Sequence, residues 1–182
     1  MQTIAAVARE NAEPKARQLL DGVHKALGVI PNMMATMAVS PAVLDGYLAL
    51  NAALGRGILN ARQREQIALV VAEANSCDYC LAAHSYIGKG AGLSDEEILE
   101  SRQGRSADHK TLALLKLAQE IVATRGRLTA SDVNGYRGRG LTDAEIAEVV
   151  AHVALNVFTN YFNLTSGTEV DFPAVPALEV VG

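Results

Sequence analysis

Helix-starting signals recur along this chain of 182 residues, and they restrict its fold more than any other feature. Three places fit the capping-box pattern, in which a hydroxyl side chain is followed three residues later by a carboxylate: Ser94 and Glu97, Thr129 and Asp132, Thr142 and Glu145. Apolar residues at helical spacing follow these boxes, whereas strand signals are nearly absent. The sequence therefore predicts an all-α fold.

The same signals set the expected helix bounds. Helices are expected from Pro14 to Gly28, from Pro41 to Gly55, from Asn60 to Asn75, from Ser76 to about Lys89, and over roughly 107–125 and 143–162. Pro31-Asn32 is interpreted as a turn, and the residues from Thr165 onward as extended. Aromatic residues make up only 4% of the chain. Alanine, leucine and valine must therefore fill the core, and small side chains let helices approach closely, as in a bundle.

The length fits one domain with short extensions. We expect an N-terminal helical extension over 1–24, a helical domain over 25–163 and an extended C-terminal tail over 164–182. An alanine-rich helical surface also suggests an oligomer.

Charge and hydropathy exclude several classes of protein. The formal net charge is −4 and no basic stripe appears, so a nucleic-acid partner is not expected. No apolar run approaches 18 residues, which argues against a membrane span, and the first 30 residues lack the apolar core of a signal peptide. No glycine-rich phosphate loop follows a strand, so no nucleotide or flavin cofactor is implied. We expect a cytoplasmic protein.

Cys77 and Cys80 are the two cysteines of the chain. A secreted disulfide scaffold needs more cysteines, so a close pair without a signal peptide indicates redox or metal chemistry in a reducing compartment. With Ser76 as the cap of a new helix, both thiols lie on one face, near a helix N-terminus that favours thiolate over thiol. His84 lies one further turn along and can hold or pass a proton.

Two carboxylates, Glu65 and Glu73, lie on the segment that leads to the cysteines, and spacing alone does not choose between them. Other interpretations of the cysteine pair remain open at this point. The thiols could be structural, or they could bind zinc with His84, although the chain offers no evident fourth ligand. The remaining histidines are isolated, and no role is assigned to them: His24, His109 and His152.

Taken together, these residues resemble the signature of the AhpD-like (alkylhydroperoxidase D, carboxymuconolactone decarboxylase) family. The resemblance rests on Arg64-Glu65, on Cys77, Cys80 and His84 in that order, on the Leu27–Asn32 stretch followed by Ser40-Pro41, and on the 149–171 run with Asn156, Phe158 and Asn160. It covers roughly residues 25–172. It implies an all-helical, AhpD-like domain that assembles as a homotrimer or homohexamer.

The resemblance also implies an activity and a set of roles. Redox-active members reduce hydroperoxides, and a dithiol donor such as a lipoylated or thioredoxin-like protein then reduces their disulfide. By this resemblance Cys80 attacks the peroxide, Cys77 resolves the sulfenate, and Glu65 and His84 form a proton relay. No metal or cofactor is implied.

The sequence departs from the family pattern beside the second cysteine. Tyr79 stands where the prototype has a histidine, so we expect a simpler or differently tuned relay, with Tyr79 and Glu73 as accessory residues. Two alternatives are kept. One is a muconolactone decarboxylase, although that branch lacks the cysteine pair. The other is a non-enzymatic helical oligomer that binds zinc or another ligand.

Overall fold

The computed structural model describes residues 2–176 and 178, and within them the chain is helical without strands. The α-helices are α1 (Pro14–Leu27), α2 (Asn32–Met37), α3 (Pro41–Leu54), α4 (Ala61–Ala74), α5 (Asp78–Gly90), α6 (Asp95–Arg102), α7 (His109–Thr124), α8 (Ala130–Gly138) and α9 (Asp143–Ser166). A short 3-10 helix precedes them at Arg9–Asn11. The all-α prediction is confirmed. No helix in this described part of the chain is long and apolar enough to cross a membrane.

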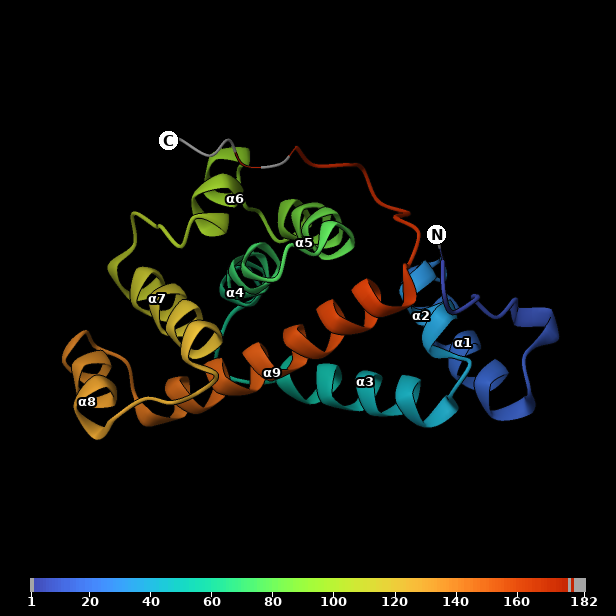
Figure 1. Cartoon of the computed structure of the whole chain (residues 1–182), viewed down its shortest axis with the longest axis horizontal. Coiled ribbons are helices and arrows are strands. Elements are labelled where there is room, and N and C mark those ends of the chain that lie inside the picture. The colour runs from blue at the N-terminus through green and yellow to red at the C-terminus, as the bar shows by residue number, and fades with distance from the viewer. Residues whose placement is uncertain (1, 177, 179–182) are drawn as a thin grey trace.

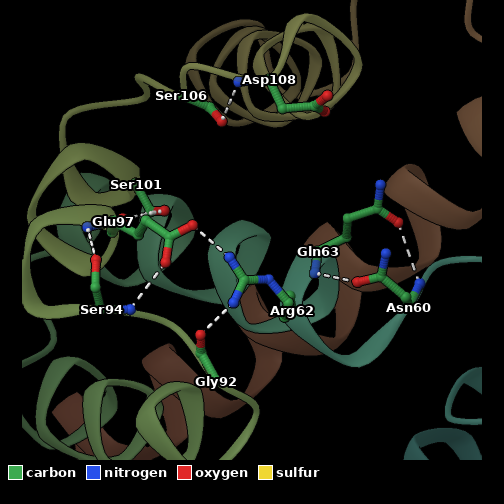
Figure 2. Close-up of polar contacts among 9 residues, drawn as sticks. All are labelled: Asn60, Arg62, Gln63, Gly92, Ser94, Glu97, Ser101, Ser106 and Asp108. Atoms are coloured by element: carbon green, nitrogen blue, oxygen red, sulfur yellow. Dashed lines mark hydrogen bonds and ion pairs between the residues drawn. The ribbon is translucent and has the colours of Figure 1, made fainter.

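The predicted capping boxes are present at the N-termini of α6, α8 and α9. A fourth box starts α4, where Asn60 and Gln63 exchange side chain-to-backbone hydrogen bonds (Figure 2). Beside it, Arg62 binds the Glu97 carboxylate and the Gly92 carbonyl (Figure 2). The Asn60–Gln63 box satisfies backbone groups that a helix end leaves unpaired, and the Arg62 contacts join the start of α4 to the first turn of α6 and to the loop before it.

Helix α4 is the centre of the fold, since it packs against α5, α6, α7 and α9. Figure 1 shows the long helix α9 running beneath α4, with α3 alongside it. One face of α4 joins the core that contains Leu69 and the two cysteines, and another joins the core around Leu114 and Val149. The end of α4 therefore delivers the chain to Cys77 from a well-packed scaffold.

Two helix bounds differ from the expectations. Residues 32–37 form α2, so the interpretation of Pro31-Asn32 as a turn alone was wrong: Pro31 sits just before the helix, where its missing N–H is not needed. Helix α9 continues to Ser166 and ends at Gly167, whose φ of 61° suits a left-handed cap. Its last turn lies beyond the expected end at residue 162, so the expectation of an extended chain from Thr165 onward was wrong for Thr165 and Ser166.

The extended segment after α9 crosses back over α5 towards α6 (Figure 1). It is held at two points: the Asn32 backbone N–H donates to the Asp171 carboxylate at 2.7 Å, and Arg102 donates to the Pro176 carbonyl at 2.9 Å. Between them, Phe172 packs against α5. The division at residues 24 and 163 stays a prediction, although Leu20 of α1 packs in the same core as the cysteines.

Candidate active site

Helices α4 and α5 are separated by a residue with left-handed backbone conformation. Ser76 has a φ of 52°, and Cys77, not Ser76, is the N-cap of α5. The expectation that Ser76 caps this helix was therefore wrong. The backbone N–H of Cys80 instead points at the Cys77 sulfur, 3.3 Å away. A sulfur atom thus occupies the position where a helix terminus favours negative charge.

Cys77 and Cys80 are joined by a disulfide, with their Cα atoms 5.3 Å apart. Both residues are buried. The Asn163 amide on α9 donates a hydrogen bond to the Cys80 sulfur at 3.4 Å, and its nitrogen also lies 3.4 Å from the sulfur of Met33. The sequence spacing predicted that the two cysteines lie close together, and the structure places them so.

A second pair lies one turn beyond Cys80. Nδ1 of His84, on α5, is 2.8 Å from Oε2 of Glu65, on α4. Both side chains are only partly exposed, at 22% for His84 and 17% for Glu65. A carboxylate at this distance fixes the orientation of the imidazole.

Cys80, His84 and Glu65 line one cavity of about 400 Å³, a volume suited to a small organic molecule. Cys77 is not among its lining residues. Most of the wall is apolar, from Leu27, Val29, Pro31 and Met34 near α1 and α2, Tyr86 and Ile87 on α5, Leu155 on α9 and Phe172 on the C-terminal segment. The cysteine that faces the cavity is thus the second of the pair.

Glu73 lies elsewhere. Its carboxylate pairs with the Arg102 guanidinium at 2.7 Å, and it is not among the residues that line the cavity. Arg102 is buried, so Glu73 neutralises a charge that would otherwise be expensive to bury. The structure brings Glu65, but not Glu73, together with His84.

Two tyrosines in the cavity wall stay neutral phenols. Tyr79 accepts a hydrogen bond from the Met33 backbone N–H at 3.2 Å, and burial raises its pKa well above the usual value. Tyr47, on α3, has its pKa raised to about 12, first by burial and then by the negative charge of Glu65. Neither group is placed to serve as a base at neutral pH.

Helix α9 contributes lining residues to which no role was assigned. His152, Asn156, Thr159 and Asn163 are all buried and line the cavity. They recur every three or four residues, so they form one polar stripe on a largely apolar helix. The sequence carries a signal for this stripe, because these polar residues recur at helical spacing on the otherwise apolar face of the helix. Burial lowers the pKa of His152, and the neighbouring Arg64 lowers it further.

Within residues 2–176 and 178, no group of three or more His, Cys, Asp or Glu side chains is arranged to hold a metal ion. The candidate site is a cysteine pair close to a histidine–carboxylate pair, at the wall of a mostly apolar cavity.

Comparison with known proteins agrees with this geometry. The sequence model of the carboxymuconolactone decarboxylase family matches residues 41–122, which include Glu65, both cysteines and His84. An uncharacterised protein of Haemophilus influenzae is 46% identical over 46 residues, a match that spans 25% of this chain and 41% of that protein.

Solved structures match over nearly the whole chain. The AhpD-core, peroxidase-related protein of Ralstonia eutropha JMP134 superposes with a TM-score of 0.84 at 22% identity, covering 93% of this chain and 92% of that one. The debrominase Bmp8, in complex with 2,3,4-tribromopyrrole, gives a TM-score of 0.78 at 17% identity, covering 94% and 92%. At these identities the likeness shows the fold. Together with the family match over residues 41–122, it shows that the chain is similar to members of the AhpD-like, carboxymuconolactone decarboxylase family.

Proposed function

We propose that this protein is a cysteine-dependent peroxidase that reduces organic hydroperoxides through Cys77 and Cys80. The observation that carries the proposal is the position of Cys80. Its sulfur lies at the wall of an apolar cavity whose lining also contains the His84–Glu65 pair. A thiol, a proton-transfer pair and room for an organic molecule are the parts that such a reaction needs.

The reaction starts from the reduced pair. The Cys80 thiolate attacks the terminal peroxide oxygen, the O–O bond breaks, and the alcohol leaves with a proton supplied through His84 and Glu65. Cys80 is then a sulfenic acid. The Cys77 thiol attacks its sulfur, water leaves, and the disulfide forms. Two electrons have passed from the two thiols to the peroxide.

The cycle closes when an external dithiol reduces the disulfide by thiol–disulfide exchange, and the donor becomes a disulfide in turn. We propose a lipoylated or thioredoxin-like protein as donor. Cys77 is buried and does not line the cavity, whereas Cys80 does. Small dithiols would therefore reach the pair most readily from the side of Cys80.

A disulfide, instead of a peroxide, is a second substrate for the same chemistry. A carbon–halogen bond is a third, because a dithiol can also supply two electrons to it, and the debrominase Bmp8 shares this fold. We do not propose decarboxylation of a lactone, because the contacts described around Cys80 do not favour that reaction. A zinc-stabilised or ligand-binding oligomer without activity remains the alternative from a different class.

A parallel screen tests the proposal. Purified protein is given tert-butyl hydroperoxide, cumene hydroperoxide or a bromopyrrole, each with dihydrolipoamide, thioredoxin or glutathione as donor, and loss of the substrate is followed. Turnover with a dithiol that disappears in Cys80→Ser supports the peroxidase. Turnover only with a bromopyrrole would favour dehalogenation. If neither the peroxides nor the bromopyrrole are consumed, and two free thiols remain after treatment with stoichiometric peroxide, the proposed redox function is contradicted.

We also propose that the chain assembles as a homotrimer or homohexamer. The outer face of α9 exposes apolar side chains at helical spacing, namely Val150, Phe158, Tyr161 and Leu164. An exposed apolar stripe of this kind is typical of a surface that another subunit covers. Light scattering at several concentrations tests this assembly, and a monomer throughout would contradict it.

A further inference from the structure

The cavity beside Cys80 has a polar region that the proposed thiol chemistry does not use. His152, on α9, lines the cavity, is 4% exposed, and has a buried Nε2 atom without a hydrogen-bond partner among residues 2–176 and 178. A buried polar atom without a partner is costly to the fold, so such atoms usually meet a ligand or an ordered group. The fold therefore buries the His152 side chain but gives its Nε2 atom no hydrogen-bond partner among the described residues.

Arg64, on α4, lines the same region. One of its nitrogens donates to the Leu59 carbonyl at 2.6 Å, and in the part of the chain that the structure describes it takes part in no ion pair. A guanidinium has five N–H donors in a fixed fork, so this single bond leaves others for a ligand. Its positive charge adds to the burial that keeps His152 neutral.

His152 lies well away from the reacting sulfur along α9. Asn163 marks the sulfur end of α9, because its amide donates to Cys80. His152 lies on the same helix, about 16 Å away along the axis at the usual rise per residue. Leu155, Val29 and Met34 are among the apolar residues that line the same cavity. A reactive end and a cationic end thus lie in one cavity whose wall is mostly apolar, with Asn156 and Thr159 as polar residues between them on α9.

We propose that the cavity takes an organic hydroperoxide with a carboxylate at its opposite end, joined to the peroxide by an apolar chain. Arg64 binds the carboxylate, His152 donates a second hydrogen bond to it, and the peroxide lies at Cys80. This inference rests on the proposed peroxidase function and names its substrate class.

A carboxylate suits this end better than a phosphate. Guanidinium and carboxylate form two parallel hydrogen bonds with matched geometry. Arg64 is the one Arg or Lys among the described lining residues, and the carboxylates Glu65 and Asp171 also line the cavity. A group with a single negative charge is therefore balanced by Arg64, whereas a doubly charged group would be repelled by the acidic neighbours.

A matched pair of substrates tests the inference. The hydroperoxide of a long-chain fatty acid and that of its methyl ester share the reacting group and the chain, and they differ only in the carboxylate. We expect the wild-type KM for the acid to be about tenfold or more below that for the ester, since charge-assisted hydrogen bonds are the strong ones. Arg64→Gln should abolish this preference, and Arg64→Lys should restore part of it.

His152→Phe should lower the preference for the acid as well, because it removes the second donor. The matched control is Arg127→Gln, which removes an exposed arginine that does not line the cavity and should leave the ratio of KM values unchanged. Equal KM values for acid and ester in the wild-type protein would overturn the inference while leaving the peroxidase intact.

Binding without turnover separates the two proposals. Decanoate and decanol carry no peroxide, and calorimetry measures their affinity directly. Tighter binding of decanoate that is lost in Arg64→Gln supports the carboxylate site even if neither hydroperoxide is reduced, in which case only the peroxidase fails. Equal binding of decanoate and decanol, with or without turnover, overturns the carboxylate site.

Discussion

The imidazole of His84 and the carboxylate of Glu65 meet at 2.8 Å across the packed pair α5 and α4, beside the cavity that Cys80 lines. Spacing in the sequence did not choose between Glu65 and Glu73 as the partner of this histidine. The fold brings Glu65 to the imidazole and Glu73 to the Arg102 guanidinium. Each carboxylate therefore has a distinct expected effect when it is neutralised.

Neutralising either member of the relay should slow peroxide reduction. We expect Glu65→Gln and His84→Gln each to lower the rate by about 10²-fold, the usual size of general acid–base assistance. Stopped-flow measurement of peroxide loss at pH 7 checks this, with Glu96→Gln as control because Glu96 is exposed on α6. Wild-type rates in both variants would exclude the pair from the mechanism.

Neutralising Glu73 should affect folding instead of rate. In Glu73→Gln the buried Arg102 charge loses its carboxylate partner, and we expect the free energy of unfolding to fall by about 2–3 kcal/mol. The loss is set at the low end for a buried pair because the Glu73 side chain is 26% exposed. Denaturant unfolding and the rate at 25 °C are measured on the same sample. An unchanged stability with a slowed rate would instead place Glu73 in the relay.

The two cysteines should give different products when one is removed. Cys77→Ser should still consume one equivalent of peroxide and leave a sulfenate at Cys80, because Cys80 lines the cavity and lies one turn before His84. Cys80→Ser should show no burst. Trapping with a dimedone-type probe, followed by mass spectrometry, locates the sulfenate. A full burst with the sulfenate at Cys77 would reverse the assignment and favour the helix-terminus effect at the N-cap.

The buried His152 should make the fold sensitive to mild acid. Its pKa is lowered by burial and by Arg64, against smaller opposing effects of Glu148 and Glu65, so the unfolded chain binds a proton more readily than the folded one. This contribution to stability is fully present above about pH 6.5, the usual histidine value, and is lost as the pH falls through the lowered pKa.

Unfolding free energies at pH 7.5 and 5.5 check this expectation. The wild-type protein should lose stability between the two values, and His152→Gln should lose less. His24→Gln is the control because His24 is exposed on α1. An equal pH dependence in the wild type and in His152→Gln would show that other groups control the acid sensitivity.

Local signals predicted much of the fold and only part of the site. Caps and breakers such as Thr142 and Gly28 act within a few residues, so the helix bounds they set were close to those observed. The Cys77, Cys80 and His84 arrangement depends on spacing within one helix, and it was accessible for the same reason. Spacing could not predict the contacts between helices, because the choice of Glu65 over Glu73 depends on how α4 packs against α5 and α6.

The contribution of α9 was missed for a related physical reason. A lone histidine such as His152 reads as a surface or core residue unless its neighbours are considered together. Asn156, Thr159 and Asn163 recur with it at helical spacing, and only the packing of α9 against α4 and α5 turns that stripe towards the cavity. Periodic polar residues on an apolar helix are thus a signal to look for a lined cavity.

The left-handed backbone at Ser76 has a consequence for how this site can change over time. A serine at a φ of 52° carries a conformational cost on the order of 1 kcal/mol, which glycine would relieve. Glycine would also loosen the unfolded chain by a similar amount, so the two residues should be nearly neutral for folding. A β-branched residue would not be tolerated as well. Exchange between serine and glycine at position 76 should therefore leave the stability of the fold nearly unchanged, while it alters the freedom of the backbone immediately before Cys77.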